Sequence, residues 1–219
     1  MAAYDLEEQE QLDELKTWWK MHGDKITAVV AAVAIGLAAW QGWNWWQRSQ
    51  SAQAAELYAG VQQAFAGGDP KRARDIAGEL IDKYSGTAYA GMGALLSAKV
   101  QAATGDAKTA RAQLGWAAEH AKDDAVRDLA RLRLASLMLD DKDYDGAMKT
   151  LAAEPAAPFL PRFGELKGDI LASQGKTAEA KAAYEAALAK LDAGDKSAAR
   201  DAYREILQAK LDALGGPAK

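Results

Sequence analysis

The sequence predicts an all-α protein in which a transmembrane helix near the N-terminus is followed by an array of helix-pair repeats and a C-terminal capping helix. Three observations lead to this prediction. One long stretch near the N-terminus carries no charge, and turn residues recur every 33 to 37 residues in the rest of the chain. The segments between the turns have the apolar period of helices and no convincing alternation of strands.

Residues 1–25 are predicted to form an acidic tail. They hold seven acidic residues against three lysines, and Leu12, Leu15 and Trp18 recur at helical spacing. We therefore expect a short amphipathic helix near the membrane surface.

The rest of the chain after the span is neutral, because residues 47–219 hold 24 acidic and 24 basic residues. This neutral balance gives no reason to expect nucleic acid as a partner, because binding phosphates requires an excess of basic residues.

The uncharged stretch, residues 26–47, is closed by Lys25 and Arg48. At about 1.5 Å per residue it extends roughly 33 Å, enough to cross a hydrocarbon core about 30 Å thick. Six of the seven tryptophans lie at its edges, as interfacial anchors in contact with lipid would: Trp18, Trp19, Trp40, Trp43, Trp45 and Trp46. We expect a transmembrane helix here. The core helix of a soluble protein is the alternative, but such a core has no reason to gather tryptophans at the two ends of one segment.

A cleaved secretory signal is a second alternative, since Ala52, Gln53 and Ala54 have the small-x-small form of a cleavage site. The acidic tail is unlike a short basic n-region, which favours an uncleaved anchor.

The orientation of the span in the membrane is predicted from the basic residues on its two sides. Lys16, Lys20 and Lys25 precede the span, whereas Arg48 alone follows it closely. This bias favours a cytoplasmic N-terminus and a periplasmic C-terminal domain. The absence of cysteine suits a bacterial periplasm.

Within the span, Ala28, Ala32 and Gly36 form a small-x₃-small ladder on one helical face. Such a ladder lets another transmembrane helix approach closely, so it is a candidate docking face. An alanine-rich span also produces this ladder by chance.

Residues 48–66 continue the helical pattern and are expected to form a neck that leads into the first helix of the soluble domain, residues 67–219.

The repeats are marked by four turns with a common pattern after each. The turns are Gly68-Asp69, Gly105-Asp106, Lys142-Asp143 and Gly175-Lys176, and an alanine follows each at the same offset: Ala73, Ala110, Ala147 and Ala180. We expect these alanines to lie where the two helices of a pair approach closely. The third repeat departs from the pattern at Glu154, just before Pro155.

The segment GDILASQGKTAEAKAAYEAAL, residues 168–188, resembles a tetratricopeptide repeat. The matching positions are Gly168, Leu171, Gly175, Ala180, Tyr184 and Ala187. Such repeats stack into an array whose inner surface commonly binds peptides or partner proteins. Residues 195–214 follow too soon to form another full unit and are expected to form the capping helix. Its apolar residues would cover the last repeat: Ile206, Leu207, Leu211 and Leu214.

The order of acidic tail, small-residue span with a Gly-Trp-rich edge (GLAAWQGWNWWQ, residues 36–47) and degenerate repeats resembles the bacterial ancillary SecYEG translocon subunit family. The resemblance implies a non-enzymatic inner-membrane protein that has no cofactor. Its periplasmic domain would work beside the SecYEG translocon with a membrane-anchored, parvulin-type periplasmic chaperone and assist newly translocated, unfolded client chains. The alternative is an anchored scaffold for an envelope assembly complex that does not bind clients.

Motifs that bear chemistry are few. There is no cysteine, and the two histidines, His22 and His120, lie on opposite sides of the span. Residues 141–146 match half of an EF-hand loop, but Ala152 stands where the closing glutamate would be. Gly175-Lys176-Thr177 lacks the upstream glycine of a phosphate loop. We therefore expect no catalytic, cofactor or metal site, and a membrane-tethered enzyme is the least favoured alternative.

Overall fold

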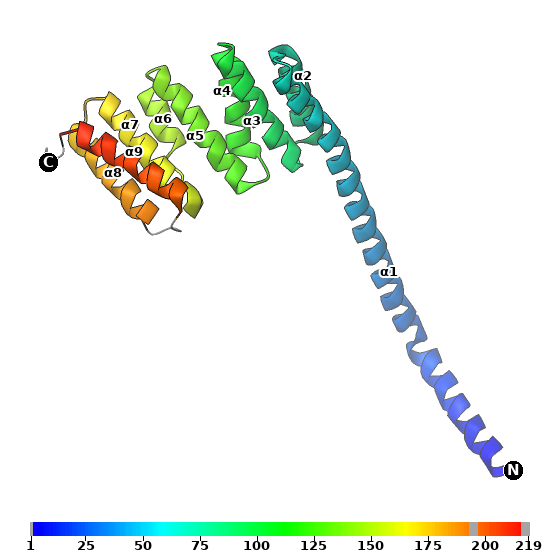
Figure 1. The fold of residues 1–219 in the computed structure, drawn as a ribbon. Helices are drawn as coiled ribbons and strands as arrows, with labels where there is room; N and C mark the ends of the chain where they lie inside the picture. The colour runs from blue at the N-terminus through cyan, green and yellow to red at the C-terminus, as the bar shows by residue number, and fades with distance from the viewer. Residues whose placement is uncertain (1, 193–196, 216–219) are drawn as a thin grey trace. The chain divides into compact units, whose positions relative to one another are not determined.

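The computed structural model describes residues 2–192 and 197–215, and describes side chains from residue 11 onward. Within these residues the fold is all-helical and contains no strand, which confirms the predicted class (Figure 1). Residues 195 and 196 of the expected capping helix, and the last four residues of the chain, lie outside the described part. The helices are α1 (Ala2–Ala66), α2 (Pro70–Tyr84), α3 (Ala88–Ala103), α4 (Ala107–His120), α5 (Asp124–Asp140), α6 (Tyr144–Thr150), η1 (Ala157–Phe159), α7 (Leu160–Ser173), α8 (Thr177–Asp192) and α9 (Ala198–Ala213).

The chain divides into two compact units, Met1–Ser49 and Gln50–Lys219. The first unit consists of the N-terminal part of α1. That helix contains a window long and apolar enough to cross a membrane, and no residue of the window is buried. The side chains of Val29, Ile35 and Trp45 are all more than half exposed. Such apolar surface is unfavourable in water and is suited to an apolar surrounding such as the core of a membrane.

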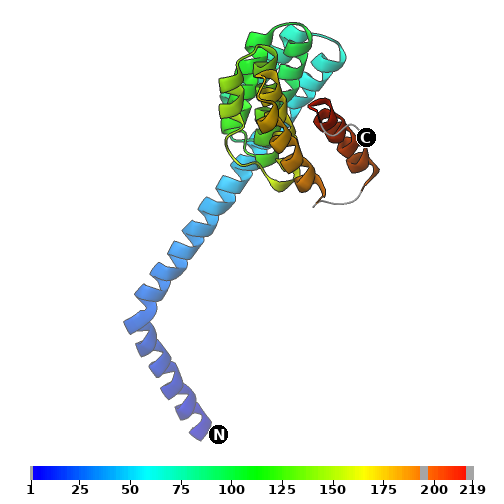
Figure 2. The same cartoon turned by 90° about the vertical axis from the view of Figure 1, so that its left-hand side faces the viewer.

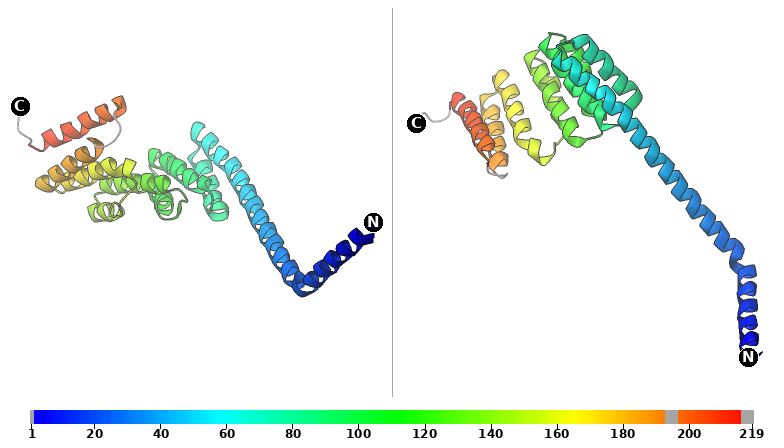
Figure 3. Two further views of the ribbon diagram at one scale, coloured as in Figure 1. Left: turned by 90° about the horizontal axis from the view of Figure 1, so that it is seen from below. Right: turned by 45° about the vertical axis from the view of Figure 1, so that its right-hand side comes forward.

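The second unit is an array of helix pairs, which we call the repeat domain. It begins with the last part of α1, where Ala54 and Val61 are fully buried. Helices α2 to α9 contact the next helix along the chain or the next but one. The colours of the ribbon therefore follow one another in order along the domain (Figure 3), and α9 lies beside α8 (Figure 2). The pairs are the end of α1 with α2, then α3 with α4, α5 with α6, and α7 with α8.

The turns inside the pairs share one backbone geometry. Gly68, Gly105 and Gly175 have positive φ angles of 65°, 84° and 76°, a region that glycine enters without steric cost. In the third pair Lys142 takes this place with a φ of 62°. In each turn the next residue donates its N–H to the carbonyl five residues back, as Asp106 does to Gln101, which is the pattern of a Schellman motif. The recurring turn residues therefore end one helix and start the next.

Aspartates cap the helices that follow three of these turns. Asp69, Asp106 and Asp143 accept hydrogen bonds from backbone N–H groups three residues ahead, at 3.0 to 3.1 Å. Capping of this kind contributes roughly 1 kcal/mol per helix. For Asp106 the hydrogen bonds from Thr109 lower the carboxyl pKa. The capping role of Asp143 accounts for one of the aspartates in the run that matches half of an EF-hand loop.

The core of the repeat domain runs continuously from pair to pair. Successive apolar clusters join the end of α1 with α2 and α3, then α3 with α4 and α5, then α5 with α6 and α7, and finally α7 with α8 and α9. Each pair thus buries its apolar surface against its neighbours, as solenoid repeats do. The alanines at the common offset, Ala73, Ala110, Ala147 and Ala180, have no exposed surface.

The third pair differs from the others because α6 has only 7 residues. The chain then passes through Pro155 to η1. The carboxylate of Asp128, on α5, fixes this connection: it accepts a hydrogen bond from the N–H of Ala156 at 2.8 Å and pairs with Arg131 at 3.0 Å. Asp128 is 3% exposed, so both partners are needed to compensate its burial.

Helix α9 closes the C-terminal end of the array. Leu207 is fully buried, and Leu211 and Leu214 pack against the same cluster. Ile206 was expected to join them, but its side chain is 50% exposed. The reason is helical geometry: Leu207 and Leu211 are one turn apart on the buried face, whereas Ile206 is rotated by about 100° from Leu207.

Candidate binding surfaces

The predicted docking face of the span is uncovered in the structure. A Cβ atom added at Gly36 would have no other atom within 4 Å. Ala28 and Ala32 lie on the same helix at intervals of four residues and are exposed. The six predicted interfacial tryptophans are also exposed, by 47% to 71%, and the rings of Trp43 and Trp46 lie 5.2 Å apart. The small-residue ladder and the tryptophans stay predictions as membrane contacts.

The predicted repeat-packing residues gather in several places. Five of them come together between α7 and α8: Gly168, Leu171, Ala180, Tyr184 and Ala187. Gly168 faces the ring of Tyr184, where a Cβ atom would overlap the aromatic carbons. The absence of a side chain therefore lets the two helices approach. Ala73, Ala110 and Ala147 lie in three separate clusters of the earlier pairs.

An open groove lies between α3 and α5, the first helices of the second and third pairs. It has a volume of about 350 Å³, and α3 and α5 are in contact. Its lining is mostly apolar and includes two cations: Ala98, Lys99, Ala102, Leu114, Leu132, Arg133, Ser136 and Leu137. We call this surface the α3–α5 groove. Sequence reasoning missed it, because the lining residues come from three helices and no local spacing relates them.

The two cations of the α3–α5 groove have no carboxylate partner within the described residues. The ammonium of Lys99 lies 5.0 Å from the ring centre of Phe65, and Arg133 donates a hydrogen bond to the carbonyl of Leu95 at 3.4 Å. The other two arginines in the first half of α5, Arg127 and Arg131, each pair with an aspartate three residues earlier. The residue three before Arg133 is an alanine, so its charge is not neutralised locally.

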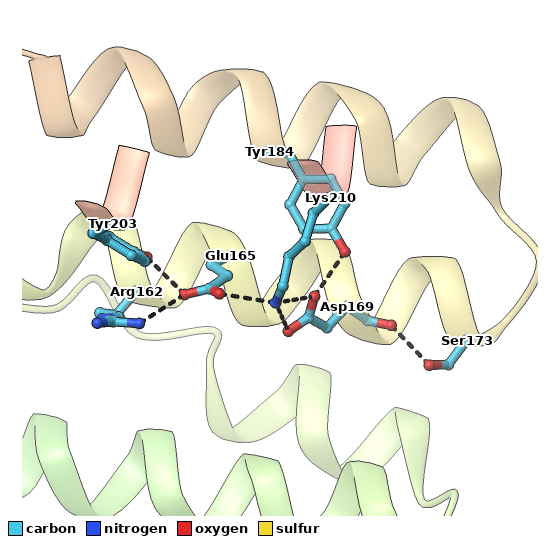
Figure 4. Close-up of polar contacts among 7 residues, drawn as sticks. All are labelled: Arg162, Glu165, Asp169, Ser173, Tyr184, Tyr203 and Lys210. Carbon is cyan, nitrogen blue, oxygen red and sulfur yellow. Dashed lines mark hydrogen bonds and ion pairs between the residues drawn. The ribbon is translucent and has the colours of Figure 1, made fainter. Parts of the chain in front are cut away.

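A second cluster of charged side chains joins α9 to α7 (Figure 4). Lys210, on α9, lies 2.8 Å from a carboxylate oxygen of Glu165 and 2.7 Å from one of Asp169, both on α7. The hydroxyl of Tyr203 donates to Glu165 and that of Tyr184 donates to Asp169, each at 2.7 Å. Arg162 completes the cluster, with a nitrogen 3.2 Å from Glu165 and its guanidinium 3.7 Å from the ring centre of Tyr203. We call these six residues the cap cluster.

The pKa values in the cap cluster show how the charges are stabilised. Burial alone would raise the pKa of Glu165, but hydrogen bonds from Lys210 and Tyr203 and the nearby positive charges outweigh it and lower that pKa. Burial likewise opposes the charged form of Lys210, and the two carboxylates outweigh it and raise its pKa. The pKa values of Tyr184 and Tyr203 are raised by burial and by donation to carboxylates. All four shifts favour an ionised Glu165, an ionised Lys210 and neutral tyrosines at pH 7, which is the state that holds α9 against α7.

Comparison with known proteins places the chain in a family. A family model described as a tetratricopeptide repeat-like domain matches residues 16–216. The ancillary SecYEG translocon subunit of Neisseria gonorrhoeae is 31% identical over 217 residues, which cover 98% of this chain and 100% of that protein. The chain belongs to the ancillary SecYEG translocon subunit family.

Other relatives in the ancillary SecYEG translocon subunit family match over similar lengths. The protein of Haemophilus influenzae is 30% identical over 84% of this chain and 90% of its own length. The protein of Escherichia coli K12 is 27% identical over 98% of this chain and 99% of its own length. These matches confirm the resemblance inferred from the order of parts. The match to the Escherichia coli protein spans nearly the whole chain and therefore includes both the apolar helix and the repeats.

Proposed function

We propose that this protein is a non-enzymatic, single-pass inner-membrane subunit that accompanies the Sec translocon. Residues 1–25 would form its cytoplasmic tail, 26–47 the span, 48–66 the neck and 67–219 the periplasmic repeats. The observation that carries the proposal is the full-length match to proteins named ancillary SecYEG translocon subunit. The uncovered apolar surface of α1 supports a position in the membrane, in contact with lipid.

We further propose that the repeat domain helps a membrane-anchored, parvulin-type periplasmic chaperone to handle newly translocated chains. The α3–α5 groove supports this role, because an open surface with an apolar floor and unpaired charges is suited to transient contact with peptide segments. The principal rival is a scaffold for an envelope assembly that does not contact clients.

In vivo crosslinking with a photoreactive residue at Ser136, inside the α3–α5 groove, tests client binding. A client binder should capture many nascent exported chains, and the crosslinks should depend on continued protein synthesis. A scaffold should give a few discrete bands that persist after synthesis stops. A photoreactive residue at the exposed Lys71 on α2 serves as the control position outside the groove.

The orientation predicts the behaviour of reporter fusions. Three lysines precede the span and Arg48 alone follows it, so alkaline phosphatase fused after Lys219 should be active, since that enzyme works only in the periplasm. The same reporter fused at Met1 should be inactive. Activity at Met1 alone would place the repeat domain in the cytoplasm and reject the proposed topology.

The small-residue ladder predicts a selective loss of partner contact. The double variant Ala32→Leu with Gly36→Leu should still insert, because leucine favours insertion, and should still fold, since the added side chains meet no other part of the chain at Gly36. Larger side chains would separate closely packed helices, so recovery of SecYEG in mild detergent should fall about threefold or more.

A matched control for this double variant is Val30→Leu with Ala34→Leu, which adds bulk on the opposite face of the same helix. It should retain its partner. If the ladder variant also retains SecYEG fully, while removal of residues 52–219 abolishes recovery, then the span only anchors the protein and recognition lies in the repeats.

A further inference from the structure

From the α3–α5 groove we propose a specific ligand chemistry: it binds a partner polypeptide segment in which bulky apolar side chains are flanked by aspartate or glutamate. The inference rests on the proposed function, because it assumes that the repeat domain contacts other chains. It goes further by naming the groove, the charge of its ligand and the two side chains that select it, Lys99 and Arg133.

Charge complementarity is the first support. Lys99 is the only charged residue on α3, and neither Lys99 nor Arg133 has a carboxylate partner within the described part of the chain. Elsewhere in the repeat domain arginines are commonly neutralised, as Arg111 is by Asp141 at 2.6 Å. The groove therefore combines two available cations in a domain whose overall charge is balanced, and it attracts anionic groups selectively.

The apolar floor is the second support. Leu114, Leu132 and Leu137 line the groove, and the partly exposed side chains of Met92 and Phe65 extend the apolar surface of the same part of the domain. Met92 is seven residues, about two turns, before Lys99 on α3, so the two share a helical face. A purely charged ligand would leave this floor in contact with water, whereas leucine-sized side chains would bury it.

The size and polarity of the groove favour a peptide as the occupant. A volume of about 350 Å³ is at the small end of ligand sites and accommodates a few side chains rather than the two acyl chains of a phospholipid. The hydroxyl of Ser136 is exposed beside Arg133 and can donate a hydrogen bond to a peptide carbonyl. Asp140, one turn beyond Ser136, lies outside the lining. The acidic side chains of the ligand would face Lys99 and Arg133, the two charged residues of the lining.

Fluorescence anisotropy with the full-length protein in phosphatidylcholine nanodiscs tests the proposal. Three labelled probes differ in one feature each: Gly-Ser-Glu-Leu-Leu-Glu-Gly-Ser, its lysine counterpart Gly-Ser-Lys-Leu-Leu-Lys-Gly-Ser, and its polar counterpart Gly-Ser-Glu-Ser-Ser-Glu-Gly-Ser. The glutamate–leucine probe should bind about tenfold more tightly than either counterpart. Its affinity should fall as salt is added, because the attraction between partly exposed charges is screened.

The double variant Lys99→Glu with Arg133→Glu separates charge selection from misfolding. It should bind the glutamate–leucine probe about tenfold more weakly and bind the lysine–leucine probe more tightly than the unchanged protein does, and a misfolded protein could not gain affinity in this way. The control is Lys71→Glu with Lys108→Glu, which changes the net charge equally at exposed positions on α2 and α4 outside the groove. The control should keep the original preference.

Each other outcome overturns the inference. Equal binding of all three probes would show a groove without charge selection, and the proposed function would survive if crosslinking at Ser136 still captured exported chains. Binding of no probe together with no crosslinking to exported chains would reject client binding itself. Loss of binding to vesicles of phosphatidylglycerol and phosphatidylcholine in the double variant, with peptide binding unchanged, would assign the two cations to anionic lipid instead.

Discussion

Replacing Gly168 with alanine should destabilise the repeat domain by about 2–3 kcal/mol, although alanine is the better helix former. The new Cβ atom would overlap the ring of Tyr184 on α8. Because the Tyr184 hydroxyl also donates to Asp169, the ring cannot move aside without losing that hydrogen bond. Urea unfolding of residues 50–219, followed by circular dichroism, measures the change in the free energy of unfolding.

Gly115→Ala is the matched control for this substitution. Gly115 also lies inside a helix, α4, but a Cβ atom there would have no other atom within 4 Å. The control should therefore stabilise the domain by roughly 0.5–1 kcal/mol, the ordinary gain from glycine to alanine. In a Tyr184→Leu background the cost of Gly168→Ala should shrink, because the smaller side chain removes the overlap. A cost that is unchanged in that background would show that the contact with Tyr184 is not its cause.

Replacing Glu165 with glutamine should release α9 from the rest of the array. Glutamine keeps the shape, but it removes the negative charge that faces Lys210 and Arg162. Losing one member of a largely buried ionic cluster costs roughly 2–3 kcal/mol. Hydrogen exchange should show this as faster exchange of the α9 amides, with little change in α2 to α4. Glu154→Gln, an exposed acid in the connection after α6, should have little effect.

The same substitution should alter the response to pH. The pKa of Glu165 is lowered in the folded protein from its ordinary value of 4.5, so the carboxylate contributes stability above that value. This contribution is lost as the pH falls through the lower, folded-state pKa. The difference in stability between the unchanged protein and Glu165→Gln should therefore be full at pH 7 and shrink below about pH 4. A difference that is equal at pH 7 and pH 3 would contradict the role of the charge.

The parts of the fold that could be predicted from the sequence are those encoded by local patterns. The turns at Gly68, Gly105 and Gly175 could be located because only a few residues enter the left-handed region easily. The all-helical class followed from the period of apolar residues. The third turn was located by its distance along the chain from the other turns and not by a glycine. Lys142 takes the place of the turn glycine there, with a φ of 62°.

Features that depend on contacts between distant residues could not be predicted in this way. Glu165 and Lys210 are 45 positions apart in the chain, and each taken alone has the pattern of a solvated charge on a helix. The cations of the α3–α5 groove are equally ordinary in sequence. Within the described residues neither cation forms an ion pair with a carboxylate, and only the packing of the helices reveals this. Ile206 was assigned wrongly because apolar character alone does not determine which face of a helix is covered.

The contacts of helices α2 to α9 with near neighbours in the chain have a consequence for biogenesis. Such a domain has low contact order, so no part of it must wait for a distant segment before it can fold. If the chain enters the periplasm behind its anchor, each helix pair can fold against the pair that emerged before it. Helix α9 then covers the apolar surface of the last pair. Folding would then proceed vectorially from the membrane outward, and the repeat domain would mature without leaving a long unfolded intermediate.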